Sequence, residues 1–400
     1  MKRLAALRDR LSKAEVSLTA AVLAAALALL ARFMVAFYGL GSNDIITWAG
    51  FARSIRTSSL GALYDSVPLF NHPPLMGLMA SLADAISSRF HVRFDLVFKT
   101  PVILVEWVGA IFVYRSWRTR GSRSATVAFL LFALNPTSLL ISGYHGNTDA
   151  MCAVFSLMAA FFIDAGQPLA AGLALAAAIN VKLIAVLLIP VLLSFTRSWK
   201  GVGRFSGALA IGALPFLPFV FGHWPGFRAH VLSYNSTPGY WGVTQLLVAL
   251  RETASWQATG ERLVTAYMAA GKTLVLAVSV IMATLNLWKP GRWSARDLAA
   301  IVYCLFLVVT PGFGIQYLVY PCVLLFAVNL RQAVAYGSVA GLYAAVTYLC
   351  LWTGTWPAFS DFRQVYPPVS QGLAYITWAV IAQMSVSLLN VRLRRARLPW

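Results

Sequence analysis

The 400-residue chain has few charged residues. Asp, Glu, Lys and Arg make up 11% of it, whereas hydrophobic residues make up 59%. Soluble domains contain about 25% charged residues, and a water-soluble globule could not cover this much apolar surface. The composition therefore excludes soluble enzymes and disordered chains, and it indicates a protein of the lipid bilayer.

Acidic residues and cysteines are also scarce. The chain has 13 Asp and Glu against 32 Lys and Arg, and its four cysteines, all in apolar runs, are Cys152, Cys304, Cys322 and Cys350. Such isolated cysteines predict neither a disulfide framework nor a zinc site. The chain also lacks a GxxxxGK[ST] nucleotide-binding loop. Any energy for a reaction must therefore arrive within the substrate, and we predict no cofactor.

The basic residues predict the membrane topology, because Lys and Arg gather on the cytoplasmic side of membrane helices. Most of them form clusters within residues 2–13, 115–123, 197–204, 289–296 and 392–397, with Arg331 alone. With about 20 apolar residues per crossing and an even number of crossings between clusters, the chain fits about twelve transmembrane helices (range about 10–13). We predict an all-α polytopic protein with one transmembrane domain, residues 1–400. Topology explains the positive charge, so no nucleic-acid partner is predicted.

The polar residues gather on the other, outer side of this topology. A first outer loop, residues 39–94, should contain interfacial helices, and a second long outer loop should span residues 223–272. All five histidines and most acidic residues fall in outer segments. We therefore expect a site on the periplasmic or extracellular face of the inner cell membrane. In a eukaryotic cell it would face the lumen of the endoplasmic reticulum.

Two outer segments contain candidate site residues. Asp44 starts an amphipathic helix, where a carboxylate can cap the helix and still act as a base. Asn71 and His72 precede two prolines that fix a turn, so both side chains can face a site or serve only the turn. A polar turn at residues 144–149 adds His145, Asn147 and Asp149. These side chains suit sugar hydroxyls or phosphate, but helix capping would explain Asp149 equally well.

A cation interrupts the apolar run at residues 168–193. Asn180 and Lys182 should break this run into two short helices that meet at the outer face. A lysine within an apolar stretch is a functional hypothesis by default, with an anionic group as its natural partner; snorkelling to the interface is the alternative. Glu106, in the middle of the second span, needs a partner that the sequence does not identify.

Further candidates lie in the later outer segments: Arg228, Tyr234, Trp241, Gln316 and Tyr317. Aromatic and amide side chains suit the faces and hydroxyls of sugars. Aromatic residues are equally typical of membrane-interface belts. The Gly/Pro-rich stretch at residues 311–317 should direct Gln316 and Tyr317 toward the same roofed cavity.

Taken in order, these features resemble the GT-C superfamily of membrane glycosyltransferases. They are an acid in the first outer loop, a PPL element after it, a polar turn after the third helix, a lysine in a broken apolar segment, and GFGIQYL at residues 312–318. The closest branch uses lipid-phosphate sugars, as do dolichol-phosphate-glucose glucosyltransferases and bacterial polyprenyl-phosphate-mannose mannosyltransferases. The family often has paired acids in the first loop, whereas this chain has Asn43-Asp44, so we predict no metal.

The resemblance implies an inverting transfer of one sugar, mannose or glucose, from a polyprenyl-phosphate donor to a hydroxyl of a glycolipid or glycan acceptor. Asp44 would be the catalytic base, and Lys182, with His145 and Arg228, would hold the donor phosphate. The remaining candidates would contact the sugar or the acceptor, namely Asn71, His72, Asn147, Asp149, Tyr234, Trp241, Gln316 and Tyr317.

Two other functions fit parts of the sequence. A secondary transporter or lipid flippase also uses broken helices and intramembrane cations, usually within inverted repeats. This chain shows no convincing repeat, and its polar residues gather on one face. A polysaccharide ligase or polymerase acting on a diphosphate-linked oligosaccharide would be expected to have more arginines in its outer loops.

Overall fold

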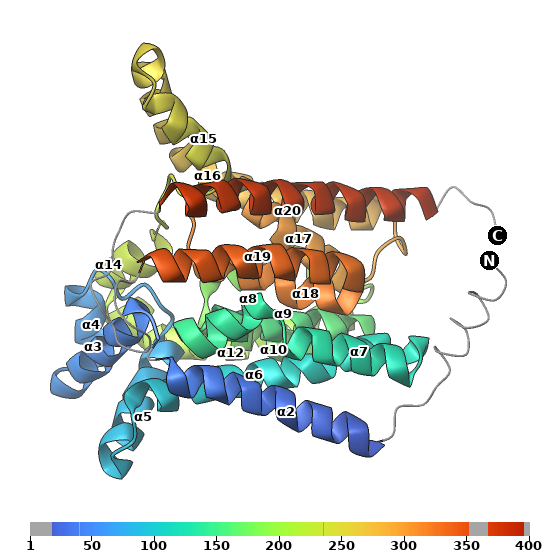
Figure 1. Ribbon diagram of the computed structural model, residues 1–400, viewed down its shortest axis with the longest axis horizontal. Helices are drawn as coiled ribbons and strands as arrows, with labels where there is room; N and C mark the ends of the chain where they lie inside the picture. Colours follow the sequence, from blue (N-terminus) through green and yellow to red (C-terminus); the bar gives the residue numbers. More distant parts are fainter. Residues whose placement is uncertain (1–17, 40, 235, 352–366, 396–400) are drawn as a thin grey trace.

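The computed structural model describes residues 18–39, 41–234, 236–351 and 367–395. All secondary structure in these ranges is helical. The long helices lie side by side in a bundle, and short helices gather at one end of it (Figure 1). Because Asp44 lies among the short helices, we call this the Asp44 end. The basic N-terminal segment, residues 2–13, and Arg397 lie outside the described residues.

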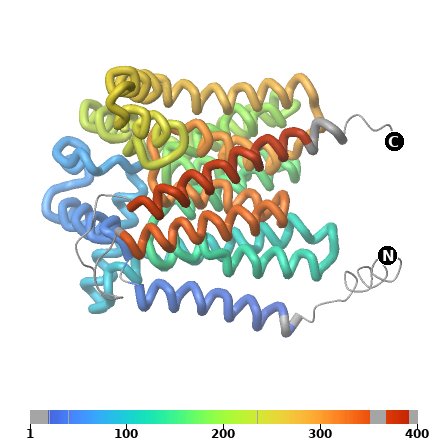
Figure 2. Tube along the Cα trace, turned by 45° about the horizontal axis from the view of Figure 1, so that its top comes forward, coloured from blue at the N-terminus to red at the C-terminus, as the bar shows by residue number. Residues whose placement is uncertain are grey.

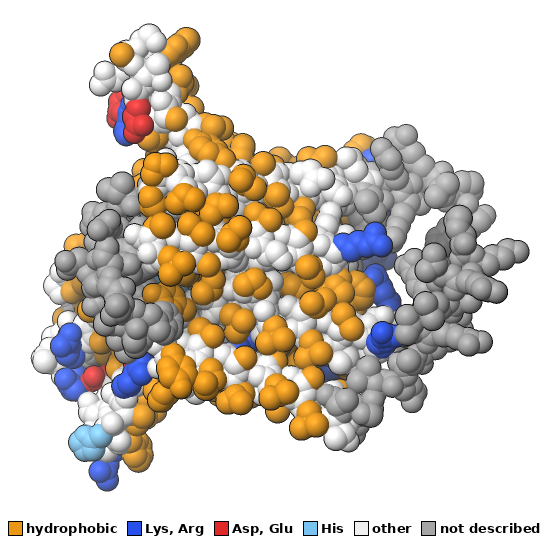
Figure 3. All heavy atoms as spheres, viewed as in Figure 1, with side chains coloured by type: hydrophobic (Ala, Val, Ile, Leu, Met, Phe, Trp, Pro, Cys, Tyr) orange, Lys and Arg blue, Asp and Glu red, His pale blue; other side chains and the backbone are white. Residues whose placement is uncertain are grey.

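Seven helical segments within the described residues are long and apolar enough to cross a bilayer: Ala21–Tyr38, Phe94–Arg120, Ser122–His145, Trp199–Gly222, Ala254–Trp288, Leu330–Cys350 and Pro368–Asn390. Hydrophobic side chains cover the visible flank of the bundle, and Lys and Arg lie mainly toward its two ends (Figure 3). A bundle with an apolar flank fits the hydrocarbon core of a bilayer. The chain is therefore an all-α membrane protein, and the full count of twelve crossings stays a prediction.

Short helices of the first predicted outer loop form the Asp44 end. They are α3 (Asn43–Thr57), α4 (Leu60–Ser66) and α5 (Pro74–Phe90). Each starts at a residue suited to a helix N-terminus: the side chains of Ser42 and Ser59 cap α3 and α4, and Pro74 opens α5. The expected amphipathic helix after Asp44 is confirmed.

The first long helices carry a buried ion pair. They are α2 (Leu18–Tyr38) and α6 (Phe94–Trp117), and η1 (Arg118–Arg120), α7 (Ser122–Ala133), α8 (Pro136–Ser138) and the π-helical turn η2 (Leu139–His145) follow. Arg32 of α2 binds the carboxylate of Glu106 in α6, and both side chains are 0% exposed. Glu106 thus has the partner that its position requires, and this pair joins α2 to α6.

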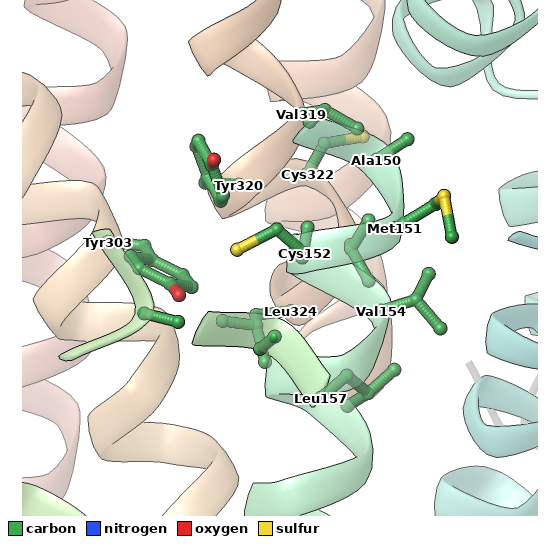
Figure 4. Close-up of a cluster of buried hydrophobic side chains, with 14 of the residues drawn as sticks. Ala150, Met151, Cys152, Val154, Leu157, Tyr303, Val319, Tyr320, Cys322 and Leu324 are labelled. Carbon is green, nitrogen blue, oxygen red and sulfur yellow. The ribbon is translucent and has the colours of Figure 1, made fainter. Parts of the chain in front are cut away.

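The core lies between α9 (Asp149–Asp164), α17 (Ala295–Val309) and α18 (Val319–Val328). Small and branched side chains let these helices approach closely, and Cys152 of α9 faces Tyr303 of α17 and Tyr320 of α18 (Figure 4). Cys152, Cys304 and Cys322 are buried and free. They fill core space like other small apolar side chains.

The predicted break at Lys182 is confirmed. Helix α10 (Pro168–Val181) ends there, and the chain continues through the 3₁₀ helix η3 (Leu183–Leu187) into α11 (Leu188–Leu193). Lys182 itself is extended, with φ −156° and ψ 135°. Such backbone is tolerated at membrane depth where it lines a cavity or is buried in protein.

The segment predicted as the second long outer loop, residues 223–272, is mostly helical. After α12 (Trp199–Ala213), η4 (Leu214–Phe216) and α13 (Leu217–Gly222) come α14 (Trp224–Phe227), η5 (Arg228–Leu232), α15 (Gly242–Arg251) and η6 (Ala254–Trp256). Helix α16 (Gln257–Trp288) then begins well before residue 273. Its first turns and α15 project from the bundle (Figure 1). Because these turns contain polar residues, the sequence did not predict that they are helical.

The last helices close the bundle. They are η7 (Ile315–Leu318), which leads into α18, then α19 (Leu330–Leu351) and α20 (Pro368–Arg395). Helix α20 packs against α17 and α19, and the tube view confirms that they run side by side (Figure 2). Helix α17 begins with a Ser294–Asp297 capping box. Its Arg296 pairs with Asp164 at the end of α9, with Nε 2.6 Å from Oδ2, which fixes the end of the bundle far from Asp44.

Candidate active site

Asp44 lies at the start of α3 and is held by the polar turn at residues 144–149. Its Oδ2 atom lies 2.9 Å from Nε2 of His145 and accepts a 2.8 Å hydrogen bond from Nδ2 of Asn147. The other ring nitrogen of His145, Nδ1, lies 2.6 Å from the hydroxyl of Tyr348 in α19. The structure therefore joins Asp44 and His145, which the sequence analysis placed in different roles.

Backbone geometry fixes the relative position of these two segments. The hydroxyl of Ser42 donates to the carbonyl of His145 at 3.2 Å and accepts from the amide of Asp44 at 3.1 Å. Gly146 has a φ of +73°, and a Cβ atom there would lie 2.5 Å from Cδ1 of Ile45. Only glycine allows this left-handed turn to sit so close to α3.

Asp44 is held in its ionised form. Burial raises its pKa, but the nearby His145, Asn147 and Lys182 outweigh burial and keep the pKa well below the usual value for a carboxyl. The side chain is 32% exposed, and no hydrogen bond to Oδ1 is found within the described part of the chain. One carboxylate oxygen is thus available to an incoming hydroxyl.

Lys182 belongs to a second polar cluster. Its Nζ lies 2.7 Å from Oδ2 of Asp149, which is 0% exposed, and Oδ1 of Asp149 accepts a hydrogen bond from the hydroxyl of Tyr320. The ammonium also lies 5.1 Å from the centre of the Tyr317 ring. Asp149 is therefore the charge partner of Lys182, as well as the first residue of α9.

A cavity of about 320 Å³ opens beside Lys182. Its walls come mainly from η3, α16 and the turn before η7, and they include Leu183, Ile184, Val275 and Leu276. Its polar atoms come from Asn71, Lys182, Tyr234, Ser236, Lys272, Thr310 and Tyr317, and none of the acidic residues that the structure describes lines it. The cavity thus combines apolar walls with two ammonium groups.

Glycines bring the cavity walls together. A Cβ atom on Gly271 of α16 would lie 2.1 Å from Cγ of Pro311, and one on Gly312 would lie 2.4 Å from the carbonyl oxygen of Ser236. Side chains at these positions would therefore collide with neighbouring segments. The two glycines let the 311–312 turn sit directly against α16 and residue 236.

His72 lies between the two clusters. The centre of its ring lies 4.4 Å from that of Trp48, and its buried Nδ1 has no hydrogen-bond partner among the described residues. Burial and the charge of Lys182 lower its pKa to about 3, although Asp44 raises it. Lys182 lines the cavity, and its charge lowers the pKa of both Asp44 and His72.

Three predicted site residues are not brought into this arrangement. Trp241 is 0% exposed; its indole N–H donates to the carbonyl of Leu307 at 2.6 Å, and its ring stacks on Phe313. Its role is therefore structural. Arg228 is exposed on η5, and Gln316 is half-buried; neither lines the cavity. Asn71, Tyr234 and Tyr317 line the cavity as expected.

Sequence reasoning missed three residues of the site region, Lys272, Tyr320 and Tyr348, and it also missed Arg32, the structural partner of Glu106. The sequence could have identified Arg32, because a cation in the first apolar run needs a buried acid as its partner, and Glu106 is one. The two tyrosines lie in distant helices with no local motif around them. Lys272 lay at the edge of a segment predicted to be a loop.

No protein-family model matches this chain, and no curated protein matches it. Among the described residues, no three His, Cys, Asp or Glu side chains lie close enough to share a metal ion. The chemistry of this site must therefore be inferred from the geometry of the two polar clusters and the cavity.

Proposed function

We propose that this protein is an inverting membrane glycosyltransferase of the GT-C type. It would move one sugar, mannose or glucose, from a polyprenyl-phosphate carrier to a hydroxyl of a glycolipid or glycan. In this proposal the chain crosses the inner cell membrane about twelve times, and the Asp44 end faces the periplasm or cell exterior. The lumen of the endoplasmic reticulum is the equivalent in a eukaryotic cell.

One observation carries the proposal. An ionised, partly exposed carboxylate, Asp44, lies at the same end of the bundle as an apolar-walled cavity that is lined by Lys182 and, among the described residues, by no acid. A polyprenyl-phosphate sugar has an apolar chain, an anionic phosphate and an anomeric carbon next to that phosphate. Its parts match the apolar walls, the ammonium groups and the neighbouring carboxylate in turn.

The residues suggest a direct displacement. Asp44 would take the proton of the acceptor hydroxyl as its oxygen bonds to the anomeric carbon on the face opposite the phosphate. The bond between that carbon and the phosphate oxygen would break, and the lipid phosphate would leave with the electron pair. A positioned base contributes about 10²–10⁴-fold to such a reaction.

Donor binding would also make Asp44 a better base. Lys182 is one of the groups that lower the pKa of Asp44. A phosphate anion beside the ammonium would offset its positive charge and raise that pKa. His145 and Asn147 would continue to hold Oδ2, which leaves Oδ1 for the acceptor hydroxyl.

The test is an Asp44→Asn variant assayed for release of lipid phosphate and for glycosylated product with a panel of polyprenyl-phosphate sugars. We expect transfer to fall by about 10²–10⁴-fold, with thermal stability and donor binding close to wild type. Asp65→Asn is the matched control, because Asp65 also contacts a histidine at this end, with Oδ2 2.7 Å from Nδ1 of His223. Full activity of Asp44→Asn would exclude the mechanism.

A further inference from the structure

The two ammonium groups of the cavity have different partners. Nζ of Lys182 lies 2.7 Å from the fully buried carboxylate of Asp149, so the charge of Lys182 is already compensated. Nζ of Lys272 donates to the carbonyl of Leu232 at 3.0 Å. Within the described residues, Lys272 takes part in no salt bridge. It is therefore the uncompensated cation of this cavity.

Lys272 lies on the apolar face of α16. The cavity-lining residues Met268, Gly271, Lys272 and Val275 recur at the spacing that places side chains on one face of a helix. A single helix face thus presents apolar groups on either side of an ammonium. Its natural ligand is amphipathic, with an apolar chain next to an anionic group.

We propose that Lys272 is the main contact for the phosphate ester of a single lipid whose chain lies against η3 and α16. Lys182 lies beside the same phosphate but shares its charge with Asp149, so Lys272 distinguishes an anionic lipid from a neutral one. The inference rests on the proposed function for the polyprenyl nature of the chain. The apolar walls and the unpaired ammonium are features of the cavity itself.

The experiment measures binding of two lipids of equal chain length, polyprenyl phosphate and the neutral polyprenol, to the full-length protein in nanodiscs. Lys272→Met keeps an unbranched side chain and removes the charge. We expect affinity for polyprenyl phosphate to fall about 10-fold or more, in line with the strength of charge-assisted hydrogen bonds. Affinity for polyprenol should stay the same, and Lys272→Arg should retain most of the discrimination.

Lys289→Met is the matched control, because Lys289 follows the same helix at its far end, where its Nζ lies 4.5 Å from the centre of the Trp288 ring. This variant should bind both lipids like wild type. Unchanged affinity of Lys272→Met for polyprenyl phosphate would overturn the proposal, and so would equal losses for both lipids.

Two further probes identify the source of the phosphate. Inorganic phosphate should fail to displace polyprenyl phosphate at equal concentration, because it makes no apolar contacts; equal displacement would refute a lipid site. Phosphatidylglycerol that binds as tightly as polyprenyl phosphate would refute the polyprenyl chain. The readout is independent of sugar transfer. Selectivity for phosphate without any transfer would therefore refute the proposed enzyme and support this binding site.

Discussion

The Arg32–Glu106 and Lys182–Asp149 ion pairs differ in how many hydrogen-bond donors of the cation are used. In the Arg32–Glu106 pair both side chains are 0% exposed, and the guanidinium also donates to Ser138 and Ser142 and to the carbonyls of Phe132 and Ala133. In the Lys182–Asp149 pair the lysine is 16% exposed and faces a cavity. An ammonium has three donors, and the described residues accept one of them. The first pair supports the fold, whereas the second is open to a ligand.

The largest expected effect comes from breaking the closed pair. Glu106→Gln leaves the Arg32 guanidinium buried without a countercharge, and such a loss costs about 3–5 kcal/mol. We expect a large fall in the thermal unfolding temperature of the purified protein in detergent. The double variant Arg32→Met/Glu106→Gln removes both charges and should recover much of that stability. A single variant as stable as wild type would show that the pair does not support the fold.

The second prediction tests whether the two ion pairs differ in their effect on activity. Lys182→Met/Asp149→Asn removes both charges of the open pair, so no buried charge is left unpaired. We expect this variant to fold but to transfer sugar about 10²-fold more slowly, the usual loss when a preorganised charge-stabilising group is removed. Arg32→Met/Glu106→Gln should stay within a few-fold of wild-type activity. Similar activity losses in the two double variants would contradict the distinction between them.

The smallest effect concerns the histidine beside the open pair. The pKa of His72 is about 3 in the folded protein, against about 6.5 for an unperturbed histidine. Between these values the unfolded chain binds more protons, so stability rises with pH, and acidification from pH 7 to 5 costs roughly 2 kcal/mol. His72→Gln should therefore lose less thermal stability on acidification than wild type. The exposed-loop variant His91→Asn should behave like wild type.

Much of this arrangement could be predicted from the sequence. The helix after Asp44, the proline-started α5 and the break at Lys182 follow from capping residues, proline positions and a cation in an apolar run. These are local signals, and the structure confirms them. The expectation that Asp44, His145, Asn147 and Lys182 meet at one end followed from the topology, and all four lie there.

Which of these side chains contact one another could not be predicted from the sequence. Nothing local tells whether His145 will contact Asp44 or an anion, or that Tyr348 will hold the other nitrogen of its ring, because these contacts join helices far apart in the chain. The helices within residues 223–272 were not predicted either, because polar residues interrupt the apolar pattern there. On α16 they lie on the exposed side of a helix that projects from the bundle.

The contact between Gly271 and Pro311 bears on the size of guest that the cavity admits. At that point the ring of Pro311 packs directly on the backbone of α16, which has no side chain at Gly271. The methyl group of an alanine at position 271 would push the two segments apart. The absence of a Cβ atom at Gly271 thus sets the width of the cavity. A Gly271→Ala exchange would change the thickness of the lipid chain that the cavity accepts without altering any charged group.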